Sequence, residues 1–117
     1  MVPAARGELT GAAMCAAAEL GQDLLLWSVD RGPGGVATPA AVADHLAWAV
    51  RPGDVIGLHD GIGRGTFDPR GPAARRLRSR RLVELAALPM ALQRLRARGI
   101  RLVTASTLAE AAGLARP

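Results

Sequence analysis

The chain has 117 residues, a length that suits one small domain or part of a larger one. Half of the residues are hydrophobic and 21% are charged, which is enough apolar surface to build a core and excludes a disordered tail. Aromatic residues make up only 3% and tyrosine is absent, which disfavours an all-β sandwich and a base-stacking nucleic-acid module. We therefore expect residues 1–117 to form a single domain, whole or partial.

The net charge of +5 rests on arginine alone, because the chain has no lysine. Six of the arginines lie between residues 70 and 81, and such a cluster could bind nucleic acid. No aromatic side chain interleaves with it, so we predict a solvated helix start and no nucleic-acid partner. No apolar stretch reaches the ~20 residues of a membrane helix, and the N-terminus lacks a signal peptide's apolar run, so we expect no membrane partner and, as written, a cytoplasmic location.

The first part of the chain predicts a helix, a strand and a loop. Residues 8–20 are rich in Ala, Met and Leu and should form a helix that ends at Gly21. Cys15 lies within it and is expected to be a small buried side chain rather than a nucleophile. Residues 24–29 form a continuous apolar run too short for a helix, which indicates a strand buried on both faces. The Gly and Pro residues of 30–36 indicate a loop.

The middle of the chain predicts a helix, a turn and a second strand. Residues 38–50 open with a capping threonine and a proline at the first helical position, which favours a helix. The Arg-Pro-Gly-Asp sequence at 51–54 is typical of a turn. Residues 55–58 predict a short buried strand that delivers His59 at its C-terminal end, and a Gly-rich loop follows at 61–72.

The last part of the chain predicts a long helix, a third strand and a short helix. Residues 75–98 have helical periodicity that closes on Gly99, with a kink or a break into two abutting helices expected at Pro89. Residues 100–105 are apolar and predict a strand. The capping-box pattern Thr-Leu-Ala-Glu, which begins at Thr107, predicts the start of a final helix.

This alternation of helices and strands predicts the α/β class, with about three parallel strands joined by helical crossovers. Such a thin sheet has edges that need pairing or covering. Chemistry in α/β folds lies at the C-terminal ends of the strands. That rule selects Asp30, His59, Asp60 and Ser106 as candidate functional residues.

His59 is the leading candidate, because an imidazole between an apolar strand and a Gly-rich loop can donate or accept a proton near neutral pH. A structural histidine that shapes the turn through a backbone hydrogen bond explains the position equally well. His45 has no metal-ligating side chain four residues later, so we expect it on a helix surface. Residues 61–66 lack the Lys-Ser/Thr pair of a phosphate loop and should border a site.

Three segments share a pattern with a known family: LLLWSVD at 24–30, RPGDVIGLHDG at 51–61 and ALPMALQRLRARGIRLVTASTLAE at 87–110. Together they resemble the C-terminal half of polysaccharide deacetylases, the chitooligosaccharide- and peptidoglycan-deacetylase-type proteins of carbohydrate esterase family four. The resemblance implies the C-terminal part of an incomplete, distorted (β/α) barrel. It also implies metal-dependent removal of acetyl groups from N-acetylated sugars, a hydrolysis of carbon–nitrogen amide bonds.

The same resemblance implies roles for individual residues. Leu58 would form the pocket wall around the acetyl methyl group, and His59 would be the general acid that protonates the leaving amine. Asp30 would tune or orient the catalytic groups. The substrate would be an N-acetylated polysaccharide or oligosaccharide, and complete members of the family use a divalent metal such as zinc.

Two motifs of the family are missing from this sequence: Thr-Phe-Asp-Asp, which supplies the catalytic base and a metal ligand, and His-x-x-x-His, which supplies two metal ligands. Residues 66–69, Thr-Phe-Asp-Pro, look similar to the first motif but follow His59 and carry Pro where the second Asp belongs, so we interpret them as a coincidence. Amide hydrolysis by this route needs a metal held by several protein ligands. We therefore expect no metal site, no bound cofactor and little or no activity in this chain alone.

Two functional hypotheses follow. The chain is the C-terminal part of a deacetylase whose metal-binding half is encoded elsewhere, through truncation or a mis-assigned start. Alternatively, it is a non-catalytic α/β interaction module that associates with a second copy through exposed sheet edges.

Overall fold

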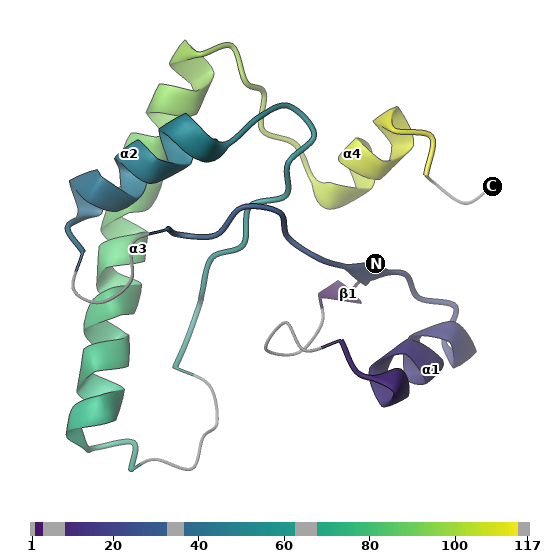
Figure 1. The fold of residues 1–117 in the computed structure, drawn as a ribbon, viewed down its shortest axis with the longest axis horizontal. Coiled ribbons are helices and arrows are strands. Elements are labelled where there is room, and N and C mark those ends of the chain that lie inside the picture. Colours follow the sequence, from purple (N-terminus) through teal and green to yellow (C-terminus); the bar gives the residue numbers. More distant parts are fainter. Residues whose placement is uncertain (1, 4–8, 33–36, 63–67, 115–117) are drawn as a thin grey trace. The chain divides into compact units, whose positions relative to one another are not determined.

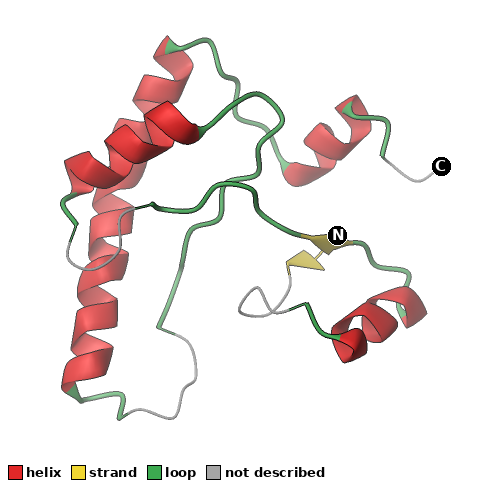
Figure 2. Cartoon of the chain, viewed as in Figure 1, coloured by secondary structure: helices red, strands yellow, loops and turns green. Residues whose placement is uncertain are grey.

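The structure, a computed structural model, describes residues 2–3, 9–32, 37–62 and 68–114 (Figure 1). Helices are their main secondary structure (Figure 2). The chain divides into two compact units, one formed by Met1–Ser28 with Val103–Pro117 and the other by Val29–Leu102. No helix in the described ranges combines the length and the apolar character that crossing a membrane requires. The start of the first predicted helix and parts of the two predicted loops lie outside the described residues.

Helix α1 (Gly11–Glu19) belongs to the first unit and confirms the predicted N-terminal helix. It begins after Thr10, whose Oγ1 accepts a hydrogen bond from the Ala13 amide at 3.1 Å. It ends as predicted at Gly21, which adopts the left-handed conformation with a φ of 63°. Cys15 is exposed, so the expectation of a buried side chain is wrong. An Ala-rich helix has no distinct apolar stripe that would mark its buried face.

Two strands of two residues each accompany α1 in the first unit. β1 (Val2–Pro3) and β2 (Leu24–Leu25) pair in parallel, with Val2 opposite Leu24. Of the predicted strand over 24–29, the first two residues form β2 and Val29 forms an isolated parallel bridge with Ile56. Leu26 and Trp27, which were expected to be buried, are exposed.

Helix α4 (Ala105–Ala111) also belongs to the first unit, and it begins inside the segment predicted as the third strand. Thr104 is its N-cap, because its Oγ1 accepts a hydrogen bond from the Thr107 amide at 3.2 Å. The predicted capping residue, Thr107, is therefore already helical. Residues 100–103 form no strand, and Leu102 and Val103 are exposed.

Helix α2 (Pro39–Ala49) opens the helical part of the second unit and begins as predicted. Thr38 is extended, and its Oγ1 accepts a hydrogen bond from the Ala41 amide at 3.1 Å. The turn predicted at 51–54 follows, closed by a 3.1 Å bond from the Asp54 amide to the Arg51 carbonyl. Gly53 has a φ of 92°, the conformation that a type II turn requires at its third residue.

Helix α3 (Pro72–Ala97) is the longest element of the structure. It runs through Pro89 as one helix, so the alternative of two abutting helices is wrong. The helix ends at Gly99, as predicted, with a φ of 77°. The Ile100 amide donates to the Leu95 carbonyl at 3.0 Å, which closes the helix in a Schellman motif.

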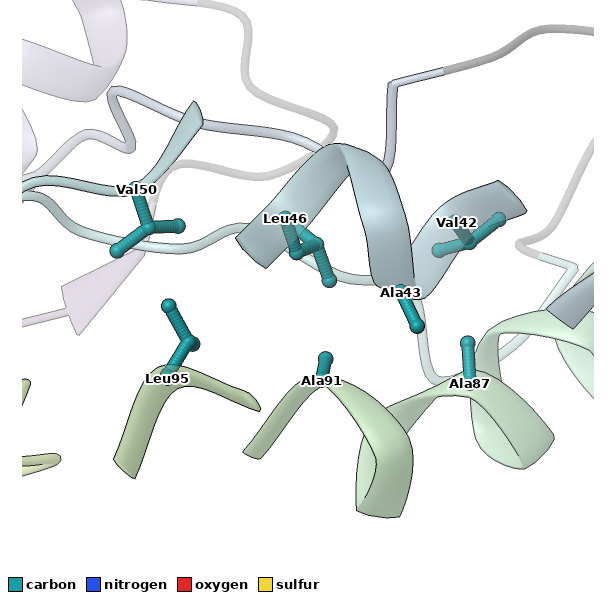
Figure 3. Packing of buried hydrophobic residues seen from close by; sticks show 7 residues of the cluster. All are labelled: Val42, Ala43, Leu46, Val50, Ala87, Ala91 and Leu95. Atoms are coloured by element: carbon teal, nitrogen blue, oxygen red, sulfur yellow. The ribbon is translucent and has the colours of Figure 1, made fainter. Parts of the chain in front are cut away.

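The core of the second unit lies between α2 and α3 (Figure 3). Residues four apart on each helix face the partner, and alanines on α3 allow a close approach. The buried residues of this α2–α3 cluster are Val42, Ala43, Leu46, Val50, Ala87, Ala91 and Leu95. The cluster is flanked by an ion pair between Arg94 and Asp44 and by hydrogen bonds from Arg98 to the carbonyls of Ala47 and Val50.

The expected part of a (β/α) barrel with about three parallel strands is wrong. In the second unit the predicted strands meet only at a parallel bridge between Val29 and Ile56, with the Gly57 amide 2.8 Å from the Val29 carbonyl. A parallel sheet is stable where helices cover both of its faces. Here α2 and α3 bury their apolar faces against each other, and Ile56 and Leu58 pack only at the border of the α2–α3 cluster.

Candidate functional site

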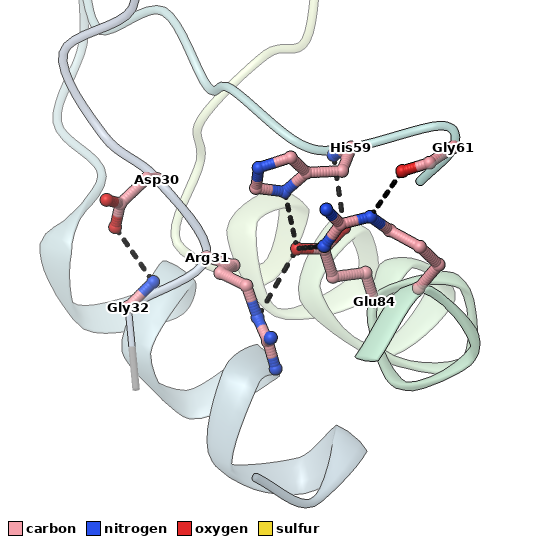
Figure 4. Close-up of polar contacts among 7 residues, drawn as sticks. Asp30, Arg31, Gly32, His59, Gly61 and Glu84 are labelled. Carbon is pink, nitrogen blue, oxygen red and sulfur yellow. Dashed lines mark hydrogen bonds and ion pairs between the residues drawn. The ribbon is translucent and has the colours of Figure 1, made fainter. Parts of the chain in front are cut away.

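His59 follows directly after the segment that forms the bridge with Val29. Leu58, the residue before it, is half-buried and packs against the α2–α3 cluster, which fixes the backbone at this point. The backbone amide of His59 donates a hydrogen bond to Glu84 Oε2 at 3.0 Å, and its ring Nδ1 lies 2.9 Å from Glu84 Oε1 (Figure 4). One carboxylate therefore holds both the backbone and the ring of His59.

Glu84 lies on α3 and its side chain is only 2% exposed. A carboxylate buried this deeply is stable only with charged or hydrogen-bonding partners. Besides the two contacts to His59, Arg31 Nε lies 3.3 Å and Arg81 Nη1 lies 3.9 Å from its Oε1. Glu84 thus connects the loop after Val29, the segment at His59 and α3.

Arg31 is as buried as its partner, with 4% of its side chain exposed. Its contact with Glu84 is an ion pair rather than a directed hydrogen bond, and none of its guanidinium nitrogens has a hydrogen-bond partner among the described residues. The guanidinium therefore acts chiefly as a buried positive charge beside the carboxylate.

Arg81 attaches the residues after His59 to α3. Its Nε donates a hydrogen bond to the Gly61 carbonyl at 2.7 Å. The segment from His59 to Gly61 is therefore held at one end by Glu84 and at the other by Arg81, one helical turn apart. This double attachment limits the freedom of the His59 ring, although half of that side chain is exposed.

A cavity of about 710 Å³ lies beside His59, a volume within the usual range of small-molecule sites. Its walls come from the segment that contains His59 and from one face of α3. Its lining combines aliphatic side chains with charged and titratable ones in about equal number. The lining residues are Leu58, His59, Asp60, Gly61, Ile62, Arg78, Arg81, Leu82, Glu84, Leu85 and Leu88.

The structure brings two of the three predicted site residues to this cavity, His59 and Leu58. Asp30 is exposed and its Oδ1 accepts a hydrogen bond from the Gly32 amide at 2.9 Å. Within the described part of the chain, no hydrogen bond or ion pair joins Asp30 to His59, so its orienting role stays a prediction (Figure 4). Of the other candidates, Asp60 lines the cavity and Ser106 lies on α4 in the first unit.

The residues present do not fit a divalent metal. Across residues 2–3, 9–32, 37–62 and 68–114, no three His, Cys, Asp or Glu side chains lie together in a way that could hold one. His59 Nδ1 is engaged by Glu84, and the ring of His45 lies against Gly32. No chemical step is therefore assigned to a metal held by these residues.

The geometry suits His59 for proton transfer. With Glu84 ionised, Nδ1 donates its proton to Oε1, and the second ring nitrogen, Nε2, is left to accept or donate a proton. Nε2 points away from Glu84 in Figure 4. A carboxylate that fixes the tautomer and orientation of a histidine is a recurring arrangement in general acid–base catalysis.

Sequence reasoning missed Glu84, Arg31 and Arg81. The sequence did contain a signal for Glu84. This residue precedes Ala87 by three residues, and Ala87, Ala91 and Leu95 follow at the spacing of one buried helix face. An acidic residue on the buried face of an amphipathic helix needs a partner, which could have marked it. No comparable signal identifies Arg31, because its burial depends on two other segments.

The chain matches no protein-family model, and comparisons with curated proteins and with solved structures find no match either.

Proposed function

We propose that this chain carries the general-acid part of a polysaccharide-deacetylase-type amidase. The substrate would be an N-acetylated sugar polymer or oligomer, and the bond broken would be the carbon–nitrogen bond of its acetamide group. The proposal rests on the resemblance of three ordered sequence segments to carbohydrate esterase family four. The barrel fold that the same resemblance implies is not formed by the described residues.

The observation that supports the proposal most is the pairing of His59 with Glu84 beside the cavity. The 2.9 Å contact at Nδ1 leaves Nε2 as the nitrogen available to a substrate. Leu58 lines the same cavity and would contact the acetyl methyl group. The residue assigned to acid catalysis and the residue assigned to the acetyl pocket are thus adjacent in space as well as in sequence.

In the proposed step His59 acts with its ring protonated on both nitrogens. A water molecule, activated by a base that the described residues do not supply, first adds to the carbonyl carbon. As the bond between that carbon and the amide nitrogen then breaks, the Nε2 proton passes to the nitrogen, so the sugar leaves as a neutral amine and the acetyl group as acetate. Nδ1 keeps its proton and its contact with Glu84 throughout the transfer. General acid catalysis of this kind contributes roughly 10²–10⁴-fold to a rate.

The described residues supply neither the metal-binding set of the family nor its catalytic base. We therefore expect no acetate release from an N-acetylglucosamine oligomer by this chain alone. Release should appear when a separately produced segment carrying the Thr-Phe-Asp-Asp and His-x-x-x-His motifs is added with zinc. It should fall by about 10²–10⁴-fold in the His59→Gln variant, whereas the His45→Gln variant should behave as the parent.

The site can also be tested without turnover, because the chain has only two histidines. In a ¹⁵N NMR titration with an N-acetylglucosamine tetramer, the ring nitrogens of His59 should shift and those of His45 should not. A deacetylated glucosamine tetramer should leave both unchanged. Equal responses to the two tetramers, or a response at His45 alone, would contradict the proposal.

The second candidate function is a non-catalytic module that pairs with a second copy of the chain. Strands of two residues offer little sheet edge, but Trp48 on α2 is exposed, as are Leu82 and Leu85 on α3. Large apolar side chains exposed on helices favour association. This function predicts a defined dimer in sedimentation equilibrium that the Trp48→Ala variant dissociates, and no response of His59 to acetylated sugars.

A further inference from the structure

The charges around the cavity indicate which kind of glycan it would accept. We infer that the substrate is acidic, an N-acetylated glycan with carboxylate groups on neighbouring sugars, and that Arg78 is the residue that selects it. This inference rests on the proposed function, since it names the substrate class of the same site.

Arg78 provides an exposed positive charge in the cavity lining. It lines the cavity from α3, one helical turn before Arg81 and Leu82. Its side chain is exposed, and no described residue forms a hydrogen bond or an ion pair with its guanidinium. Arg81, by contrast, is already engaged by the Gly61 carbonyl and by Glu84. Arg78 is therefore the guanidinium of the lining that a ligand can use.

The positive and negative groups around the cavity do not balance. Arg78 and Arg81 line the cavity together with the carboxylates of Asp60 and Glu84, and a third guanidinium, that of Arg31, contacts Glu84. Glu84 is shared by two of the arginines and by His59. Counted without His59, these groups carry one positive charge in excess, which a bound anion would balance.

The start of α3 extends the same field beyond the cavity. The stretch from residue 68 to residue 84 contains six arginines, all between 70 and 81, and only two carboxylates. At physiological ionic strength such charges act over about 8 Å, roughly the length of one or two sugars. A polymer with an acetamide group in the cavity would thus place its neighbouring sugars in a positive potential. Arginine also suits carboxylates, which its planar fork binds through two parallel hydrogen bonds.

Acidic glycan fits this surface better than nucleic acid does. Sequence-tolerant binding of single strands relies on bases that stack on aromatic side chains. The described residues that line the cavity include no Phe, Tyr or Trp. Their aliphatic side chains suit a small apolar group such as the acetyl methyl. A neutral glycan would leave Arg78 without a partner.

The test compares two N-acetylated tetrasaccharides by calorimetry on the full chain at low and physiological salt. One is the neutral N-acetylglucosamine tetramer, and the other alternates N-acetylglucosamine with glucuronate. We expect the acidic tetramer to bind about two- to fivefold more tightly per arginine contact, and the difference to shrink with salt. Arg78→Gln should remove most of the difference between the two tetramers. Arg76→Gln, which removes an equal charge outside the cavity, is the matched control and should reduce the difference much less.

The outcomes separate the inference from the proposed function. Equal affinities for the two tetramers, or equal losses in both variants, would overturn the inference while the response of His59 to acetylated sugars still supports the function. Tighter binding of a single-stranded oligonucleotide than of the acidic tetramer would overturn it too. If an acidic tetramer without acetamide groups binds as well as the acetylated one, the cavity selects anions and the deacetylase function fails. Binding of neither acetylated tetramer would refute both.

Discussion

The ion pair between Glu84 and Arg31 allows a quantitative test of the structure. Glu84→Gln preserves the size of the side chain but removes the charge that faces the buried guanidinium, which has no hydrogen-bond partner in the described part of the chain. Removing one partner of a buried pair costs about 3–5 kcal/mol, because the other charge is left uncompensated. Domains of this size have about 5–15 kcal/mol of stability in total, so the variant should be close to its folding threshold.

The same chain contains a matched exposed pair. Asp44 and Arg94 form an ion pair whose side chains are 71% and 39% exposed. Asp44→Asn should therefore cost no more than about 1 kcal/mol, since water screens the pair and solvates the remaining charge. Urea unfolding followed by circular dichroism at pH 7 measures both variants under one set of conditions, with the shift of the midpoint at a constant slope giving the change in stability.

A double variant isolates the interaction. Arg31→Met removes the buried positive charge, so adding it to Glu84→Gln should restore part of the lost stability, and the two effects should not add. The interpretation is refuted if Glu84→Gln costs no more than Asp44→Asn. It is refuted equally if the two single effects sum to that of the double variant.

Three further outcomes follow from the packing and the backbone. Leu95→Ala should lower the unfolding free energy by about 2–5 kcal/mol in urea, because Leu95 is fully buried between α2 and α3. Gly32→Ala should cost more than Gly53→Ala in the same assay: both glycines have a positive φ, but a Cβ at Gly32 would overlap the His45 ring, whereas nothing lies near one at Gly53. Thr38→Ala should cost about 0.5–2 kcal/mol and Thr38→Ser much less, since the serine hydroxyl still caps α2.

For each of these three expectations, a different result would contradict the structure. If Leu95→Ala matches the small effect of Leu82→Ala on the exposed side of α3, the α2–α3 cluster is not the core. If the two glycine variants are equally stable, the His45 ring does not lie against Gly32. If Thr38→Ser is as damaging as Thr38→Ala, the hydroxyl does not cap the helix.

The helix boundaries were the most predictable part of the fold. The Thr-Pro pair before α2 and the glycines after α1 and α3 act within one helical turn, so their effect is written in adjacent residues. The strands were not predictable in this way. A short apolar run forms a strand only if the backbone of a second segment pairs with it through hydrogen bonds. Among the described residues, no segment pairs in this way with Leu26, Trp27 or Leu102.

The candidate site likewise has residues that the sequence predicted and residues that only the tertiary structure shows. His59 and Leu58 could be selected in advance, because the change from an apolar run to a Gly-rich loop marks their position in the chain. Glu84, which holds the His59 ring, is 25 residues away on another element. Capping, turns and amphipathic faces were fixed by neighbouring residues, because hydrogen bonds within a turn need no distant partner. The buried carboxylate, its arginines and the cavity exist only through packing of α3 against two separate segments, since burial is a property of the assembled chain.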